Sequence, residues 1–123
     1  MNINYGLFRL AKIASQHSPF DKRFQMGAVI SRGKRPISIG FNKLKTHAKW
    51  PKAFSLHAEL SALLAKRFED IRGTSVWIYR ETADNKPALA RPCKICMAAL
   101  IEAGITEIYY SIPEKPYWRV EKI

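Results

Sequence analysis

The sequence has few cysteines, few acidic residues and no long hydrophobic run. Among its 123 residues are two cysteines and three histidines, and 10 acidic residues stand against 21 lysines and arginines. Two cysteines cannot build the disulfide framework of a small secreted domain. No apolar run approaches the roughly 20 residues that span a bilayer, so we expect no membrane segment. With no secretory signal to suggest export, we expect a cytoplasmic protein with reduced thiols.

The length and composition are those of one folded domain. The chain is 47% hydrophobic, which is enough for a single core and leaves no room for a second module. No internal repeat or low-complexity tract interrupts it. We therefore expect one domain over residues 1–123.

The net charge of +11 is unevenly distributed along the chain. Residues 1–56 contain eleven lysines or arginines and one acid, whereas residues 57–123 contain ten against nine. A one-sided basic field attracts polyanions, so nucleic acid or a nucleotide phosphate is the expected partner. A basic face that only keeps the protein soluble is the alternative.

Hydrophobic periodicity and turn residues predict an alternation of helices and strands. The segment 42–55 reads as a long connection, and a turn near Gly33 joins the first two strands as a hairpin. Helices are expected near residues 3–16, 57–68 and 93–104. Strands are expected at residues 27–30, 37–41, 76–79 and 108–111.

The C-terminal segment indicates how the sheet ends. Only residues 112–116 separate the strand at 108–111 from an alternating segment at 117–123, whereas a parallel crossover needs a dozen or more residues. A fifth strand should therefore pair antiparallel with the fourth.

Two short motifs hold the residues best suited to bind a metal. Cys93 and Cys96 lie one helical turn apart on one face of the expected third helix. The first turn of a helix lowers the pKa of a thiol through its unpaired N–H groups and dipole. His57 would supply a third ligand and leave the fourth position of a tetrahedral zinc open for water, whereas a structural zinc normally takes four protein ligands.

These motifs, His-Ala-Glu at 57–59 and Pro-Cys-Lys-Ile-Cys at 92–96, resemble the signature of the zinc-dependent nucleobase deaminases. The chain is identified as a member of the cytidine deaminase superfamily. The resemblance implies a three-layer α/β/α cytidine deaminase-like fold with a mixed sheet of about five strands. It also implies Zn²⁺ as cofactor, held by His57, Cys93 and Cys96, which lowers the pKa of its water towards about 7. Glu59 is then the catalytic proton carrier, to the ring nitrogen and the departing amine.

Each motif also has a simpler interpretation. A CxxC pair alone is typical of a redox pair or of half a structural zinc site, although Pro92 precedes the first cysteine instead of lying between the two. Glu59 alone could be an acid stabilised by the dipole at a helix N-terminus. The combination of both motifs favours the catalytic zinc site over these alternatives.

The family features of the chain are mixed. An antiparallel fifth strand resembles the free cytidine deaminases, whereas nucleotide, tRNA and APOBEC-type deaminases usually insert a helix there and run the strand parallel. Free cytidine deaminases, however, usually carry Cys where this chain has His57. The resemblance alone therefore leaves the substrate open.

Candidate substrate-binding residues flank the motifs. Asn42 ends a Gly-Phe-Asn segment similar to the family's G-x-N, whose Asn contacts the sugar, although Asn after a strand is also good turn chemistry. The resemblance implies that the backbone N–H of Ala58 holds the pyrimidine carbonyl oxygen. Tyr110 lies where family members often line the pocket mouth, and it could equally belong to the core.

The segment 41–54, directly before the helix expected at residues 57–68, combines cations with rings. Such a mixture suits single-stranded nucleic acid, because phosphates bind the lysines while bases stack on the rings. A solvated loop with Trp50 in the core is the alternative. The expected ring contacts are His47 and Trp50, and the expected phosphate-binding residues are Lys43, Lys45, Lys49, Lys52 and Arg91.

These features favour a zinc-dependent hydrolase that converts cytosine to uracil in single-stranded nucleic acid, with DNA favoured. The alternative is a free-nucleotide deoxycytidylate (dCMP) deaminase of nucleotide metabolism, in which a few cations hold one phosphate. A tRNA adenosine deaminase, a free cytidine deaminase and a non-catalytic nucleic-acid-binding module with a structural zinc are further alternatives. Family members commonly form dimers or tetramers, so a homo-oligomer is an open expectation.

Overall fold

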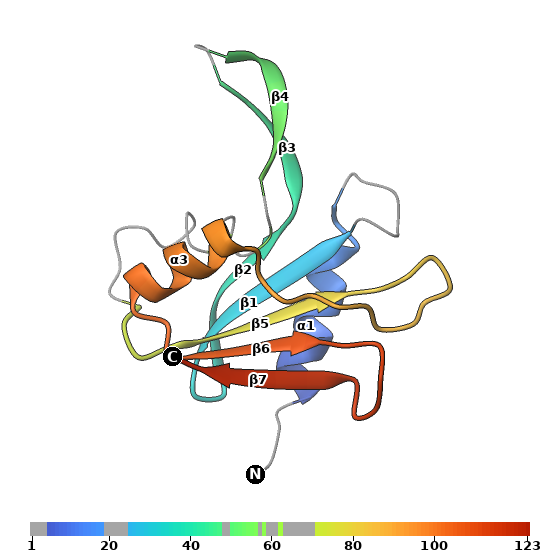
Figure 1. The fold of residues 1–123 in the computed structure, drawn as a ribbon, viewed down its shortest axis with the longest axis vertical. Helices are drawn as coiled ribbons and strands as arrows, with labels where there is room; N and C mark the ends of the chain where they lie inside the picture. The colour runs from blue at the N-terminus through green and yellow to red at the C-terminus, as the bar shows by residue number, and fades with distance from the viewer. Residues whose placement is uncertain (1–4, 19–24, 48–49, 57, 59–61, 63–70) are drawn as a thin grey trace.

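The computed structural model describes residues 5–18, 25–47, 50–56, 58, 62 and 71–123. None of the described helices is long and apolar enough to cross a membrane. The elements, labelled as in Figure 1, are α1 (Tyr5–Ser15), β1 (Met26–Arg32), β2 (Arg35–Phe41), β3 (Lys43–His47), β4 (Trp50–Leu56), β5 (Ser75–Arg80), α3 (Lys94–Ala103), β6 (Glu107–Ser111) and β7 (Trp118–Lys122).

Five of the strands form one mixed sheet in the order β2-β1-β5-β6-β7. Strand β1 pairs antiparallel with both β2 and β5, and β5 pairs parallel with β6. Because a parallel connection must cross over the sheet, the chain passes through α3 between these two strands. Strand β7 pairs antiparallel with β6, from Glu107 opposite Lys122 to Ser111 opposite Trp118. The predicted direction of the fifth strand is therefore confirmed.

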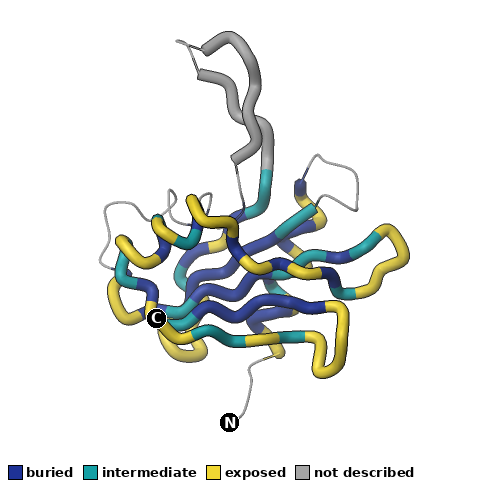
Figure 2. The backbone as a smooth tube through the Cα atoms, in the orientation of Figure 1, coloured by how far each residue is buried: buried dark blue, intermediate teal, exposed yellow. Residues whose placement is uncertain are grey.

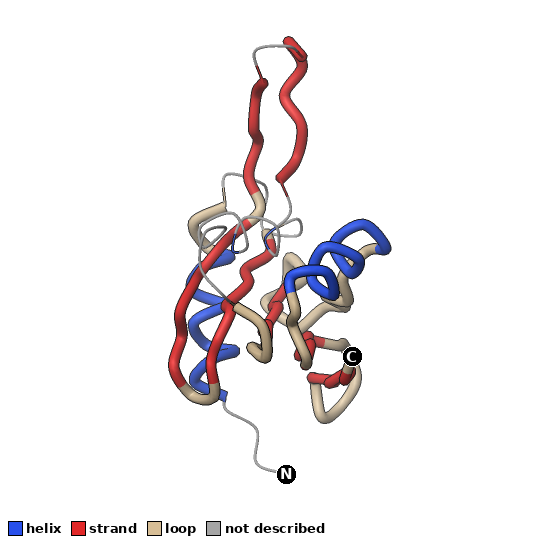
Figure 3. The backbone as a smooth tube through the Cα atoms, turned by 90° about the vertical axis from the view of Figure 1, so that its left-hand side faces the viewer, coloured by secondary structure: helices blue, strands red, loops and turns tan. Residues whose placement is uncertain are grey.

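The sheet lies between helices, with α1 on one face and α3 on the other (Figures 1 and 3). Under α1, the rings of Trp77 and Tyr109 stack with their centroids 3.8 Å apart, and Phe8 meets Trp77 edge-on. The α3 face buries a second cluster that includes Ile30, Ile78, Leu100 and Ile108. Figure 2 shows that the central strands are the most buried part of the described backbone. The three-layer α/β/α prediction is confirmed.

The prediction of a long connection over residues 42–55 is wrong. Strands β3 and β4 pair antiparallel as a separate two-stranded sheet, with Lys43 opposite Leu56 and His47 opposite Trp50. Figure 1 shows this β3–β4 hairpin projecting from the end of β2. The strands escaped prediction because they are rich in lysine, which is uncommon in strands, and contain Pro51, which cannot donate to a ladder.

Glycine at position 40 allows a close backbone approach on the α3 face. A Cβ added at Gly40 would overlap the backbone nitrogen of Ala62 and lie 2.6 Å from the carbonyl oxygen of Ala58. Both alanines are helical and completely buried. Ser38, two residues earlier on β2, also donates its hydroxyl to the Ala62 carbonyl at 2.7 Å. The backbone around Ala58 and Ala62 therefore lies directly against β2.

This contact predicts that Gly40→Ala lowers the free energy of unfolding by about 1–3 kcal/mol, the usual range for overpacking, because neither backbone can move away cheaply. Urea denaturation measures the change. Gly33→Asn is a suitable control, since Gly33 has φ +61 with open space around it, and Asn tolerates that conformation. A Gly40→Ala variant as stable as the unmodified protein would contradict the close packing.

Candidate active site

Helix α3 carries both cysteines in its first turn. Cys93 is the N-cap residue, with extended backbone and an exposed side chain, and Cys96 is completely buried. The Met97 N–H donates to the Cys93 carbonyl at 2.8 Å, which closes the turn. The two thiols thus occupy the end of the helix where N–H groups and the dipole favour negative charge. Gly104, in the left-handed region at φ 92, caps the other end.

The start of α3 lies at the edge of the sheet where β5 and β6 end. Register places Met26 opposite Arg80 and Gly27 opposite Phe41, so β1 begins at the edge where β2 and β5 finish. In open α/β sheets, ligands bind outside the carboxyl ends of the parallel strands. This edge, which we call the site edge, is therefore where the fold favours a binding site.

Ala58, the middle residue of the first motif, lies on the same face of the sheet as α3. It packs on Gly40, near the end of β2, and belongs to the same buried cluster as Leu100 of α3. Its chain neighbours His57 and Glu59 lie outside the described residues. Their roles as ligand and proton carrier therefore stay predictions.

The donor chemistry of the described residues fits two of the three predicted zinc ligands. Cys93 and Cys96, one helical turn apart, match the spacing of a thiolate pair on one metal. Within the described ranges no three His, Cys, Asp or Glu side chains form a group able to hold a metal ion. His57, the predicted third ligand, lies outside these ranges and stays a prediction.

Asn42 is anchored at the site edge by two hydrogen bonds to one residue. Its side-chain Oδ1 accepts from the Met26 N–H at 2.8 Å, and its own N–H donates to the Met26 carbonyl at 3.1 Å. The side chain therefore extends the β1–β2 ladder by one residue. The structure gives Asn42 this structural role, and its predicted contact with the sugar stays a prediction.

Tyr110 lies in the hydrophobic core on the α3 face and is 2% exposed. Burial raises the pKa of its hydroxyl, and a hydrogen bond with Glu121 adds to the rise. Arg91 donates from Nε and Nη2 to the same carboxylate at 2.7 and 3.1 Å. This bond lowers the pKa of Glu121. The predicted phosphate-binding Arg91 is thus engaged with a carboxylate of β7.

The remaining predicted contacts lie on or near the β3–β4 hairpin, for which the structure describes only the backbone. Lys49 lies outside the described residues. The backbones of Lys43, Lys45 and His47 belong to β3, and those of Trp50 and Lys52 to β4.

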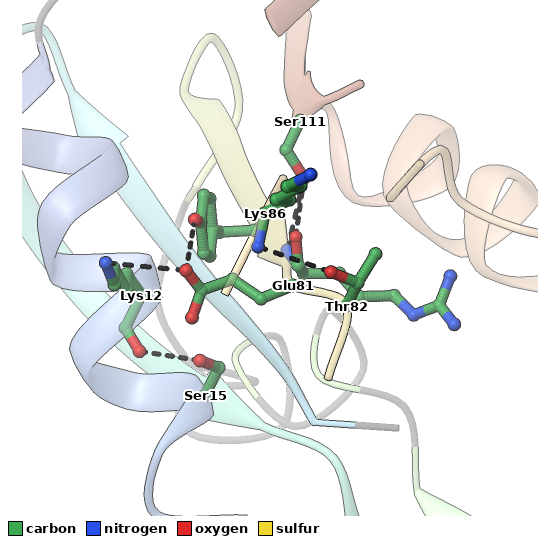
Figure 4. A network of polar contacts seen from close by, with 8 residues as sticks. Lys12, Ser15, Glu81, Thr82, Lys86 and Ser111 are labelled. Carbon is green, nitrogen blue, oxygen red and sulfur yellow. Dashed lines mark hydrogen bonds and ion pairs between the residues drawn. The ribbon is translucent and has the colours of Figure 1, made fainter. Parts of the chain in front are cut away.

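Two buried polar residues at the site edge were not predicted from the sequence. Glu81 is 5% exposed, accepts from the Tyr79 hydroxyl at 2.8 Å and lies 3.4 Å from Lys12 Nζ of α1 (Figure 4). Burial is the main reason that the pKa of the Tyr79 hydroxyl is raised, and its hydrogen bond to Glu81 raises this pKa further. Ser111 is 1% exposed at the end of β6. The sequence feature that could have indicated Ser111 is its position as a polar residue at the end of an apolar strand.

Comparison with known proteins identifies the family. The sequence profile of the cytidine and deoxycytidylate deaminase zinc-binding region matches residues 1–112. The chain belongs to this family. It is thus a member of a family of zinc-binding deaminases, and the family predicted from the two motifs is confirmed.

Two curated relatives illustrate the range of the family. An uncharacterized deaminase in the luxG 3' region of Aliivibrio fischeri is 32% identical, over 83% of this chain and 67% of that protein. The deoxycytidylate deaminase of Pongo abelii is 28% identical, over 82% of this chain and 60% of that protein. The chain thus spans about two thirds of the length of these relatives.

Solved structures of the family share the fold. The dCMP deaminase of cyanophage S-TIM5 superimposes with a TM-score of 0.65 at 26% identity, over 88% of this chain and 81% of that one. A cytidine deaminase from Burkholderia pseudomallei superimposes with a TM-score of 0.70 at 20% identity, over 98% of this chain and 93% of that one. The second similarity concerns the fold alone.

The structural role of Asn42 can be tested by substitution. Asn42→Ala should lower the free energy of unfolding by about 1 kcal/mol, because the Met26 N–H loses its acceptor. Asn42→Asp keeps a side-chain oxygen at that place and should unfold within a few tenths of a kcal/mol of the unmodified protein. Urea denaturation measures both. Equal destabilisation by the two substitutions would contradict the structural role.

Proposed function

We propose that the chain is a zinc-dependent hydrolase that deaminates dCMP to dUMP in the cytoplasm. The observation that carries the proposal is the Cys93–Cys96 pair at the start of α3, at the site edge of a deaminase fold. Similarity to dCMP deaminases from a primate and a cyanophage supports a free nucleotide as the substrate. The cyanophage enzyme has also been crystallised in complex with dCMP and dUMP.

In this proposal the metal is held by His57, Cys93 and Cys96. Zinc, when bound there, lowers the pKa of a water molecule to about 7 and supplies a nucleophile at neutral pH. Both cysteines lie at the start of α3, Cys93 as its N-cap residue and Cys96 one turn later, so their sulfurs are spaced to bind one metal.

Glu59 has the acid–base role in the proposal. Its carboxylate takes a proton from the water that adds to C4 of cytosine and delivers it to the ring nitrogen. It then carries the remaining hydroxyl proton to the amine, whose bond to C4 breaks as it leaves as ammonia. The backbone N–H of Ala58 holds the pyrimidine carbonyl oxygen. Because Ala58 is completely buried, that part of the ring is removed from water, which strengthens a hydrogen bond to it.

A free nucleotide is better supported than single-stranded nucleic acid. The curated relative from Pongo abelii and the solved structure from cyanophage S-TIM5 are both deoxycytidylate deaminases. The excess of basic residues, which by itself favours a polymer, is also compatible with binding one phosphate. The dCMP alternative is therefore the leading proposal.

A comparison of substrates tests the proposal. Zinc-loaded protein is incubated in parallel with dCMP, cytidine, and cytosine-containing single-stranded DNA and RNA, and uracil is detected by mass spectrometry. Conversion of dCMP without conversion of the oligonucleotides is the expected result. Conversion of an oligonucleotide while dCMP stays intact would overturn the choice of substrate.

Replacement of the proton carrier tests the mechanism. Glu59→Gln should lower kcat for dCMP about 10²–10⁴-fold, the usual contribution of general acid–base catalysis. Its zinc content and urea midpoint should not change, since Glu59 is not a ligand. Glu102→Gln, which neutralises an exposed acid on α3, is the matched control and should keep full activity. Turnover by Glu59→Gln at the control rate would contradict the assignment.

The β3–β4 hairpin favours single-stranded nucleic acid as a second candidate substrate. Residues 43–56 contain four lysines and no acid, and the hairpin projects from the body of the protein (Figure 3). A two-stranded hairpin is only marginally stable alone. An anionic partner along it would offset the repulsion between its lysines.

This second candidate predicts a specific loss of polymer binding. Replacing Lys43, Lys45 and Lys52 together by alanine should weaken binding of a single-stranded oligonucleotide and lower the slope of log K against log salt by roughly 0.7 for each phosphate that the variant no longer neutralises. Fluorescence anisotropy over a salt series measures the slope. An unchanged slope, with dCMP turnover intact, would rule out polymer binding by the hairpin.

A further inference from the structure

Ser111 joins three backbone groups from two different segments. Its hydroxyl accepts from the Arg80 N–H at 3.1 Å and donates to the Ala88 carbonyl at 2.7 Å. Its own carbonyl accepts from the Ala90 N–H at 3.0 Å. The side chain is 1% exposed, so these bonds form away from water. Figure 4 shows Ser111 together with Thr82 and Lys86 in one network of polar contacts.

The groups that Ser111 holds lie on the path to the cysteines. Arg80 is the last residue of β5, and Ala88 returns alongside it, with its N–H donating to the Arg80 carbonyl at 2.9 Å. Ala88 and Ala90 are both buried. The segment 88–91 is therefore an extended strap fixed on the end of β5 and on β6.

Little chain separates this strap from the first thiol. Only Arg91 and Pro92 lie between Ala90 and Cys93, and the ring of Pro92 fixes its own φ. A shift of Ala90 must therefore pass to Cys93, and from there to Cys96 one turn later.

A second anchor holds the strap at its other end. Arg91 donates two hydrogen bonds to the Glu121 carboxylate of β7, at 2.7 and 3.1 Å. Both anchors thus belong to the β6–β7 pair. Because the Arg91 side chain is half exposed, this ion pair should contribute less than the buried hydroxyl.

We propose that Ser111, with Glu121 as the weaker second anchor, is a positioning residue for the zinc-binding thiols of Cys93 and Cys96. The inference rests on the proposed function, because it requires that these thiols bind the metal. The hydrogen bonds of Ser111 described above all join backbone groups, so we assign it a positioning role and not a catalytic one. It fixes the strap that determines where α3 begins, and it thereby sets the place of both sulfurs.

A matched control exists at the opposite edge of the sheet. Ser31 is also completely buried on a strand, and its hydroxyl accepts from Trp77 Nε1 at 2.9 Å. It pairs with Ser75, the first residue of β5, so it lies at the edge away from the cysteines. Ser31→Ala removes a buried serine hydrogen bond without touching the strap.

Zinc affinity and the spectrum of the cobalt-substituted protein test the proposal. Zinc affinity is measured by competition with a chelator, and Co²⁺ reports its sulfur ligands through the thiolate-to-cobalt charge-transfer band. Ser111→Ala should weaken zinc binding about 10-fold, as is typical for residues that orient metal ligands, and should change the charge-transfer band. Ser31→Ala should leave the zinc affinity and the charge-transfer band as in the unmodified protein, even if it lowers the urea midpoint as much as Ser111→Ala does.

The possible results separate the positioning role from the proposed function. Unchanged affinity and band in Ser111→Ala, or equal changes in Ser31→Ala, would overturn the positioning role and leave the proposed function standing. Absence of a thiolate band in the unmodified protein would overturn both. If Ser111→Ala does not fold, the second anchor is tested with Glu121→Gln, and Glu114→Gln serves as the control. Glu121→Gln should bind zinc about 2-fold more weakly than the control. Equal zinc affinities of the two variants would overturn the proposal.

Discussion

The backbone contact at Gly40 is the constraint on which the site depends. The helical residues Ala58 and Ala62 lie so close to β2 that a single added methyl group at Gly40 would overlap them. This contact fixes Ala58, the middle residue of the His-Ala-Glu motif, against β2. A larger residue at Gly40 would push the backbone of Ala58 and Ala62 away from the sheet.

The other half of the site depends on hydrogen bonds at the same edge. Helix α3 starts directly after its N-cap Cys93 because the preceding strap is fixed by Ser111, and the first turn is closed by the Met97 N–H. Asn42 extends the β1–β2 ladder at this edge, and Glu81 ties β5 to α1 through Lys12. The apolar core holds the sheet and its helices together. A few buried polar groups determine where the segments with the candidate site residues begin.

Much of this arrangement could be predicted from the sequence. Hydrophobic periodicity placed the strands of the main sheet, and the short link at 112–116 predicted the antiparallel β7. The β3–β4 hairpin could not be predicted, because its lysines and Pro51 lack the apolar alternation of a strand. The Arg91–Glu121 pair and the role of Ser111 were also missed, since their partners lie 20 or more residues away in the sequence and no local pattern encodes them.

The antiparallel direction of β7 resembles the free cytidine deaminases, whereas the relatives suggest dCMP as the substrate. Both substrates require the same zinc site, so this site is the first feature to test. The most direct measurement is X-ray absorption at the zinc K-edge of the purified protein. The proposed zinc site predicts two sulfur ligands at about 2.3 Å, with the remaining ligands being nitrogen or oxygen atoms near 2.0–2.1 Å. A zinc shell with no sulfur, or a protein that retains no zinc, would contradict it.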